Sequence, residues 1–251
     1  MFYNSLIVGN GEVGASLKKV LDMRKDKESC SIIDRKDKDF KEKMSDTKCK
    51  TLHICIPYSK IFIKDVLKYL NRFQPELCII HSTVPVGTTS RINYSAFATK
   101  TAPLTHVVHS PVRGQHPNLD KGLLTFIKYV GTESNEAFEE AKKEMENMNV
   151  VWFTKPEDTE LGKLLDTSYY GLCISWHREM ERLCKHFGVS FENAVTDFNT
   201  SYNIGYSKLR TNVVRPVLSS PGKKKIGGHC VTQNAKLLNS QRRSNFLELI
   251  K

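Results

Sequence analysis

Six residues near the amino terminus, Gly9-Asn10-Gly11-Glu12-Val13-Gly14, have the types and spacing of a phosphate-binding turn. They follow the apolar run Leu6–Val8 and precede a helical pattern over 13–23, so the turn joins a strand to a helix. The first glycine permits a tight turn, the second lets backbone N–H groups approach a pyrophosphate, and the third lets helix and strand pack closely. The pattern therefore predicts a dinucleotide site made by all six residues.

An acidic residue stands where a dinucleotide site needs one. Asp34 ends a second apolar run twenty residues after Gly14, and its carboxylate could accept hydrogen bonds from an adenosine ribose. A carboxylate there repels the extra phosphate of NADP, which favours NAD, although Arg35 and Lys36 follow and could soften that repulsion. The expected cofactor-binding set is completed by Arg35, by Ile56 and Pro57 at the end of the third apolar run, and by Ser82 and Thr83.

Two further segments carry side chains suited to catalysis. The polar turn His81–Thr88 follows the carboxyl end of a strand, where ligands of doubly wound sheets bind; a simple proline–glycine loop is the alternative. Lys163 and Thr167 are one helical turn apart on one face. A lysine beside a nicotinamide can polarise a substrate oxygen or take part in proton transfer, although a single helical lysine is more often a surface residue.

Two other segments could provide a nucleophile and an anion site. In Gly227-Gly228-His229-Cys230, followed by Asn234, the glycines would let a ligand approach a cysteine whose thiolate is nucleophilic. An isolated cysteine is more often a small buried apolar side chain. Arg113, in the segment 110–114, and the distant Arg215 could hold a phosphate or carboxylate, or could simply be solvated. Substrate binding is expected at Arg113, Lys163, Arg215, Gly227, Gly228 and His229.

Short apolar runs alternate with helical patterns up to about residue 154. Strand-like segments lie at 52–56, 77–80, 105–108, 126–130 and 150–153, and helical patterns at 61–70 and 133–148. This alternation predicts an α/β fold, with an N-terminal Rossmann doubly wound parallel sheet in a domain of residues 1–154. For residues 155–251 we expect an α-helical domain built on one long helix over 157–187, followed by helices at 191–202 and from about 234.

The composition is typical of a soluble globular protein of 251 residues, with 39% hydrophobic and 26% charged residues. No apolar run approaches the ~20 residues of a membrane span, and residues 1–5 lead directly into a strand, so a cytoplasmic protein without a membrane partner is expected. The seven scattered cysteines contain no C-x-x-C pair, which disfavours disulfides and a metal site. The formal charge of +11 fits an anionic small-molecule substrate, and nucleic-acid binding is disfavoured because no nucleic-acid motif accompanies the charge.

Taken in order, these segments resemble the UDP-glucose/GDP-mannose dehydrogenase family. The matching motifs are the glycine turn with its acidic residue, then Ser82–Thr88, Glu160-Leu161-x-Lys163 and Gly227-Gly228-His229-Cys230, the last of which looks most like the branch that oxidises UDP-N-acetylmannosamine. The resemblance implies an NAD-dependent enzyme that oxidises a sugar C6 alcohol twice, to the acid. The resemblance also implies that Cys230 captures the aldehyde as a thiohemiacetal, which is then oxidised to a thioester. Lys163 would stabilise the oxygen, and Thr83 would lie beside the reacting centre. Finally, the resemblance implies a homodimer formed through the long helix.

Four departures from the family pattern affect these expectations. Asn234 stands four residues after the cysteine where the family has Asp, so the acid–base or water-activating group is absent or supplied elsewhere, for example by His229 or His177. Thr167 replaces an Asn, although its hydroxyl could still hold a water, and Val112 replaces a Glu. The chain ends 21 residues after the cysteine, so we expect a truncated member without the third, nucleotide-sugar-binding domain. The substrate is then a sugar nucleotide or a smaller anionic sugar-like molecule.

Three functions therefore stand at the level of sequence. The first is an NAD-dependent dehydrogenase acting on a CH–OH donor, with one or two oxidation steps. The second is a single-step enzyme like the β-hydroxyacid dehydrogenases, which also combine a dinucleotide domain with a helical domain but need no thiol. The third is a non-catalytic NAD-binding protein, which the replaced side chains at 112, 167 and 234 favour.

Overall fold

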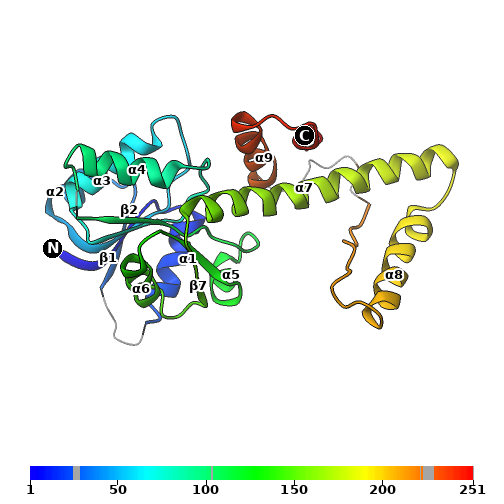
Figure 1. The fold of residues 1–251 in the computed structure, drawn as a ribbon, viewed down its shortest axis with the longest axis horizontal. Helices are drawn as coiled ribbons and strands as arrows, with labels where there is room; N and C mark the ends of the chain where they lie inside the picture. Colours follow the sequence, from blue (N-terminus) through cyan, green and yellow to red (C-terminus); the bar gives the residue numbers. More distant parts are fainter. Residues whose placement is uncertain (25–28, 103, 221, 223–228, 251) are drawn as a thin grey trace. The chain divides into compact units, whose positions relative to one another are not determined.

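Figure 1 shows the fold of the computed structural model, which describes residues 1–24, 29–102, 104–220, 222 and 229–250. The chain divides into two compact units, Met1–Lys163 and Leu164–Lys251. The sheet ends at Phe153, close to the domain boundary expected at 154, whereas the division between the units falls later, inside the long helix α7 (Pro156–Phe187).

The first unit is built on one seven-stranded sheet with the strand order β2-β1-β3-β4-β5-β6-β7. Strands β1 to β5 are parallel to their neighbours, and the side chains of each strand alternate between the two faces of the sheet. The carboxyl ends of β1 to β5 therefore share one edge, and the strand order reverses beside β1. The strands are β1 (Phe2–Val8), β2 (Cys30–Ile33), β3 (Lys48–Ile54), β4 (Leu77–Ile80), β5 (His106–His109), β6 (Lys128–Gly131) and β7 (Val150–Phe153).

Helices cover both faces of this sheet (Figure 1). On one face α3 and α4 contribute Phe62 and Ile92 to a buried cluster with Leu6 of β1. On the other face α1, α5 and α6 surround Ile7 of β1, with Leu17 from α1. This two-sided core confirms the predicted doubly wound α/β fold. The helices of the unit are α1 (Glu12–Leu21), α2 (Phe40–Asp46), α3 (Phe62–Phe73), α4 (Thr88–Ala98), α5 (Leu119–Thr125) and α6 (Asn135–Glu144).

The sheet departs from the expected all-parallel arrangement at one pair. β6 runs antiparallel to β5, with His109 opposite Gly131, and β7 runs parallel to β6. A parallel pair needs a crossover that returns the chain to the edge where the previous strand began. Here β6 starts beyond the end of β5 and runs back towards it, and the Lys128 ammonium donates hydrogen bonds to the carbonyls of Ser110 and Pro111, which follow β5.

The second unit continues α7 and adds a π-helical turn, η1 (Glu192–Asp197), with α8 (Phe198–Ser207), α9 (His229–Gln241) and α10 (Asn245–Glu248). The helix α7 begins with a proline and two acidic residues, which suit the amino-terminal end of a helix dipole. Gly171 lets α9 pack closely on α7, because a Cβ there would lie 2.7 Å from Cγ1 of Val231. The expected long helix is thus present, whereas α9 begins at His229 rather than near 234.

Candidate functional site

The glycine turn after β1 is shaped by close contacts at two of its glycines. Gly9 has φ +105°, and a Cβ there would lie 2.6 Å from the carbonyl oxygen of Cys55, which follows β3. A Cβ on Gly14 would lie 1.9 Å from the carbonyl oxygen of Gly9, so α1 can approach the turn only through a glycine. Nothing lies within 4 Å of the corresponding position on Gly11, and this open space is where the turn could admit a ligand.

Asp34 lies after β2 and is bonded to the glycine turn. Its Oδ2 accepts a hydrogen bond from the Asn10 N–H at 2.8 Å, and its Oδ1 accepts one from the Lys36 N–H at 3.0 Å. These two backbone hydrogen bonds lower the pKa of Asp34, so the carboxylate stays charged near neutral pH. Each carboxylate oxygen still has a lone pair available for a hydroxyl donor.

The neighbours of this turn carry further charge. Arg35 points to α3, where its Nη2 lies 2.7 Å from Oδ1 of Asp65 and its Nε donates to the Tyr69 hydroxyl at 3.2 Å. The carboxylate of Glu12, in the first turn of α1, contacts Nδ1 of His116. The arginine that follows Asp34 is therefore already engaged with a carboxylate.

The ends of β3 and β4 are joined by Ser82. Its hydroxyl donates to the Ile56 carbonyl at 2.6 Å, and its own carbonyl lies 3.2 Å from Nε2 of His109 at the end of β5. Thr83 is half-buried and Pro57 is exposed at the same edge. Burial lowers the pKa of His109 to about 3, so the ring is neutral and can donate to that carbonyl through one nitrogen.

The first turns of α7 hold Lys163 at this edge. The fully buried Glu160 accepts hydrogen bonds from the Gly87 N–H at 2.6 Å and from the N–H and hydroxyl of Thr89 at 2.8 and 2.7 Å. Its carboxylate thereby caps the amino-terminal end of α4. Lys163, less than one turn further on, is half-buried, and its charge contributes to lowering the pKa of His109 and of Lys128.

Arg113, expected to contact an anion, lies against two aromatic rings. Its guanidinium carbon is 5.3 Å from the ring centre of Phe126 and 5.9 Å from that of Tyr129. Such stacking holds a guanidinium plane in place while its N–H edge can still donate. We call the edge formed by the carboxyl ends of β1 to β5 the strand-end edge. In the first unit it brings together the glycine turn, Asp34, Ser82, Thr83, Arg113 and Lys163.

The second unit contains the remaining described candidates. Cys230 lies half-buried in the first turn of α9, and the buried Asn234 one turn later donates through Nδ2 to Oγ1 of Thr167 at 3.2 Å. Asn234 therefore acts as a hydrogen-bond donor to α7. His177 is buried, its Nδ1 lies 2.7 Å from the Cys173 carbonyl, and its Nε2 has no hydrogen-bond partner among the described residues.

Arg215 is also in the second unit. Its guanidinium carbon lies 3.4 Å from the ring centre of Tyr202, and its main chain forms two hydrogen bonds with the Asn203 side chain, at 2.8 and 2.9 Å. Gly227 and Gly228 lie outside the described residues, and His229 is the first residue of α9.

Two functional features were missed at the level of sequence. The contact of Glu160 with α4 was not anticipated, although its place three residues before Lys163 could have drawn attention to it. The other is a buried group formed by Lys128, His81, His53 and Glu144, whose polar residues interrupt apolar strands and helices. A polar side chain in the middle of an apolar strand is the signal that could have revealed it.

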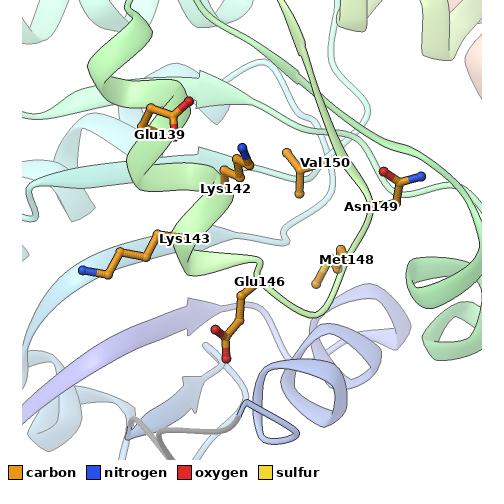
Figure 2. A pocket seen from close by; sticks show the side chains of 7 residues that line it. All are labelled: Glu139, Lys142, Lys143, Glu146, Met148, Asn149 and Val150. Atoms are coloured by element: carbon orange, nitrogen blue, oxygen red, sulfur yellow. The ribbon is translucent and has the colours of Figure 1, made fainter.

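A surface hollow of about 480 Å³ lies between the end of α6 and the start of β7 (Figure 2). Its lining, from Glu139 to Val150, includes none of the predicted site residues. Within the described ranges, no cluster of three or more His, Cys, Asp and Glu residues could hold a metal ion. Of the helices the structure describes, none combines the length and apolar character needed to cross a bilayer.

The strand order and the glycine turn define the first unit as a Rossmann-type domain, the class of fold used by nicotinamide-dependent dehydrogenases. Solved structures of such enzymes share it. The fold matches the UDP-D-ManNAc dehydrogenase of Pyrococcus horikoshii with a TM-score of 0.77 at 16% identity, over 100% of this chain and 68% of that one. It matches a UDP-glucose dehydrogenase of Pyrobaculum islandicum with a TM-score of 0.75 at 14% identity, over 100% and 67% of the chains.

In sequence the chain is 26% identical over 195 residues to the UDP-N-acetyl-D-mannosamine dehydrogenase of Methanococcus vannielii, covering 73% of this chain and 41% of the relative. The enzyme of that name from Pyrococcus horikoshii is 25% identical over 196 residues, which cover 76% and 43%. The chain thus spans about two fifths of the length of the curated relatives it matches. No protein-family profile matches the chain. Together these relatives confirm the resemblance to nucleotide-sugar dehydrogenases that the motifs indicated.

Proposed function

We propose that this protein is an NAD-dependent dehydrogenase of the UDP-glucose/GDP-mannose dehydrogenase type, oxidising a CH–OH group of an anionic, sugar-like substrate. The sequence relatives support the class of reaction. The observation that carries the proposal is the glycine turn, in which Gly11 borders open space while the Asp34 carboxylate holds the Asn10 N–H.

The residues around the turn fit a nicotinamide dinucleotide. The open space at Gly11 lies at the amino-terminal end of α1, where backbone N–H groups favour a pyrophosphate. The free lone pairs of Asp34 suit the two ribose hydroxyls, and the pairing of Arg35 with Asp65 leaves the carboxylate charge in place, which favours NAD over NADP. The cofactor, when bound, supplies the hydride acceptor.

The cationic groups of the strand-end edge favour an anionic substrate. The charge of Lys163 contributes to lowering the pKa of the buried Lys128, and Arg113 adds a stacked guanidinium. A cleft lined by one sign of charge raises the local concentration of a ligand of the opposite sign. The formal net charge of +11 acts in the same direction.

The proposed chemistry assigns one task to each polar side chain. Lys163 holds the substrate oxygen and Thr83 lies beside it. Cys230 attacks the aldehyde carbon of the first product, forming a C–S bond while the carbonyl oxygen takes up a proton. After the second oxidation, water cleaves the thioester and the thiol is released. Because Asn234 donates to Thr167 and cannot take up a proton, we assign it to positioning of that hydroxyl.

We also propose a homodimer formed through α7. Large apolar side chains of this helix are exposed in the single chain, among them Tyr169 at 62%, Trp176 at 58% and Phe187 at 70%. An apolar stripe on a long helix is stabilised when a second copy covers it.

The test uses the purified full chain with NAD and a panel of sugar nucleotides, sugar phosphates and hydroxy acids. The proposal requires formation of NADH with at least one of them, and loss of that activity in Lys163→Met at unchanged NAD affinity. Tight NAD binding without turnover of any panel member would instead identify a non-catalytic NAD-binding protein. Absence of NAD binding would refute both.

A single-step β-hydroxyacid-type oxidation is the second candidate. It is favoured by the similarity to the 3-hydroxyisobutyrate dehydrogenase of Mycobacterium tuberculosis, which has a TM-score of 0.69 at 15% identity and covers 99% of this chain and 91% of that one. The variant Cys230→Ala separates the two. Loss of only the second oxidation supports the thioester route, whereas unchanged turnover supports the single step.

A further inference from the structure

A continuous line of buried polar side chains begins at the strand-end edge of the first unit. Nζ of Lys128 lies 3.1 Å from Nδ1 of His81, and Nε2 of His81 lies 3.0 Å from Nδ1 of His53. Nε2 of His53 in turn lies 3.0 Å from Oε1 of Glu144. All four side chains are buried, with exposed fractions between 0% and 8%. We call these four residues the buried relay.

The end of the buried relay at Glu144 is fixed as a hydrogen-bond acceptor. Although burial opposes it, hydrogen bonds from His53 and Ser5 and the nearby Arg24 guanidinium hold the pKa of Glu144 below its usual value. The ionised carboxylate can only accept, so His53 must carry a proton on Nε2. Whether His53 also carries a proton on Nδ1 determines the protonation of His81 and Lys128.

In the first state, the additional proton is on Lys128. The ammonium then has three N–H groups for three acceptors, which are the carbonyls of Ser110 and Pro111 and Nδ1 of His81. His81 donates from Nε2 to Nδ1 of His53, and both rings are neutral. Every N–H in this state has an acceptor, whereas Nδ1 of His81, which carries no proton, cannot donate to the Ser110 carbonyl 2.9 Å away.

In the second state, two protons have each moved along one hydrogen bond. Lys128 has given a proton to Nδ1 of His81, and His81 has given its Nε2 proton to Nδ1 of His53. The Lys128 amine keeps two N–H groups for the two carbonyls and accepts from Nδ1–H of His81. His53 is now a cation beside the Glu144 carboxylate. Nδ1–H of His81 can now also donate to the Ser110 carbonyl at 2.9 Å, and the positive charge has moved from Lys128 to His53.

We propose that Lys128 is a positioning residue of the strand-end edge, and that the buried relay moves its charge between Lys128 and His53. The Ser110 and Pro111 carbonyls belong to the segment that carries Arg113, and His81 immediately precedes Ser82. Lys128 therefore ties together two segments of the proposed site. The charge of Lys128 affects the protonation of Lys163, and the effect of this on catalysis rests on the proposed function.

The other titratable groups around the relay keep a fixed protonation. Burial raises the pKa of Cys55 to about 12 and lowers the pKa of His109 to about 3, so the first stays protonated and the second neutral. Near Glu144, burial raises the pKas of Cys30 and Cys49 to about 12. Burial, with the charge of Lys163, lowers the pKa of Lys128 to about 7, which puts the movable proton in the neutral range.

The primary test needs no substrate. The ring nitrogens of His53 and His81 are followed by nitrogen NMR in the full chain from pH 6 to 9. Because the two states hold the same number of protons, the pH acts by removing the additional proton, which leaves Lys128 and both rings neutral. We therefore expect averaged shifts at both rings that change with a shared midpoint, and loss of this change in Lys128→Met. A single fixed tautomer of His81 over the whole range, identical in Lys128→Met, would overturn the proposal.

The matched variant is His53→Gln. A glutamine can donate to Glu144 and accept from His81, but it cannot take up a proton, so the charge stays on Lys128. Thermal unfolding of the variant checks that its fold is kept. We expect the pH-dependent shifts of His81 to be lost in this variant while NAD affinity is unchanged. Retention of the wild-type titration at His81 would contradict the relay.

The activity test separates this proposal from the proposed function. A fixed charge on Lys128 disfavours protonation of Lys163, so the pH midpoint of kcat/KM should move to lower pH in His53→Gln and to higher pH in Lys128→Met. If the pH midpoint moved in the same direction in both variants, the substitutions would have caused structural damage only, and the coupling between Lys128 and Lys163 would be refuted. If the chain proves to have no dehydrogenase activity, the NMR titration still decides whether the relay exists.

Discussion

Removal of the Glu160 carboxylate is the sharpest perturbation of the strand-end edge. This side chain is 0% exposed and accepts three hydrogen bonds from the turn that opens α4, between Gly87 and Thr89. In Glu160→Ala two backbone N–H groups lose their acceptor in the interior. Each buried donor left unsatisfied costs about 1–3 kcal/mol, so we expect a loss of about 3 kcal/mol in the free energy of unfolding.

Two milder variants calibrate that value. Glu160→Gln keeps one acceptor oxygen but turns an NH2 group towards the Gly87 or Thr89 N–H, so we expect a loss of about 1–2 kcal/mol. Glu157→Gln is the matched control, because Glu157 accepts a single hydrogen bond at 2.6 Å from the Ser90 hydroxyl and an amide oxygen can replace it. Its stability should stay within about 0.5 kcal/mol of the wild type.

The assay must report on the first unit, because the chain has two units and need not unfold in one step. The chain has two tryptophans, and Trp152 lies in β7, with its ring 5.4 Å from that of Phe138. In a Trp176→Phe background its fluorescence during urea unfolding follows the first unit. Equal midpoints for Glu160→Ala and Glu157→Gln would refute the capping argument.

The same residue predicts a pH dependence. Burial raises the pKa of Glu160 above its ordinary value of 4.5, in spite of the hydrogen bonds that oppose the shift. The folded state then binds more protons than the unfolded state in the window just above pH 4.5. Stability from this group therefore falls as the pH rises through that window and is constant above it. Glu160→Gln should lack this slope in urea unfolding measured between pH 4 and 7.

Five further substitutions test the rest of the site. Gly11→Ala should leave stability unchanged and weaken NAD binding measured by calorimetry, whereas Gly14→Ala should destabilise the first unit by about 1–3 kcal/mol because its Cβ meets backbone. Asp34→Asn should weaken NAD binding and reduce the ratio of the affinity for NAD to the affinity for NADP. An unchanged ratio would contradict the proposed role of Asp34 in selecting NAD. Cys230→Ser should stop a two-step oxidation at the aldehyde, as analysed by product chromatography. Trp176→Glu, at a 58% exposed position, should turn a dimer into a monomer in light scattering.

The strand-to-helix turn could be predicted because its signals are local. Gly9, Gly11 and Gly14 lie within six consecutive residues, and the structure gives two of them close contacts that no other residue tolerates. The long helix was similarly clear, since Pro156 and Gly188 mark its two ends and its apolar residues recur at helical spacing. The helices α2, α4 and α5 were missed. Seven residues, as in α2 and α5, are too few for a periodic pattern, and α4 buries threonines beside Ile92 and Ala96, so its apolar pattern is weak.

The direction of β6 illustrates what local signals leave open. A run such as 126–130 predicts a strand, but its direction depends on where the preceding chain delivers it. The Lys128 side chain bonds to the two carbonyls that follow β5. This contact places the start of β6 at the strand-end edge, from which β6 runs antiparallel to β5. That contact joins residues 17 and 18 positions apart, which no short pattern relates.

The amino-acid sequence by itself determined the class of fold and most of the longer elements, and it indicated candidate side chains for the chemistry, because periodicity, glycine spacing and motif order are properties of neighbouring residues. Only the tertiary structure decided that Glu160 caps α4 and that Lys128, His81, His53 and Glu144 form one line. The physical reason is that a buried polar atom is satisfied by whichever partner the fold brings within hydrogen-bonding distance. His53 and Glu144 are separated by 91 residues, and their contact exists only once α6 has packed against the sheet.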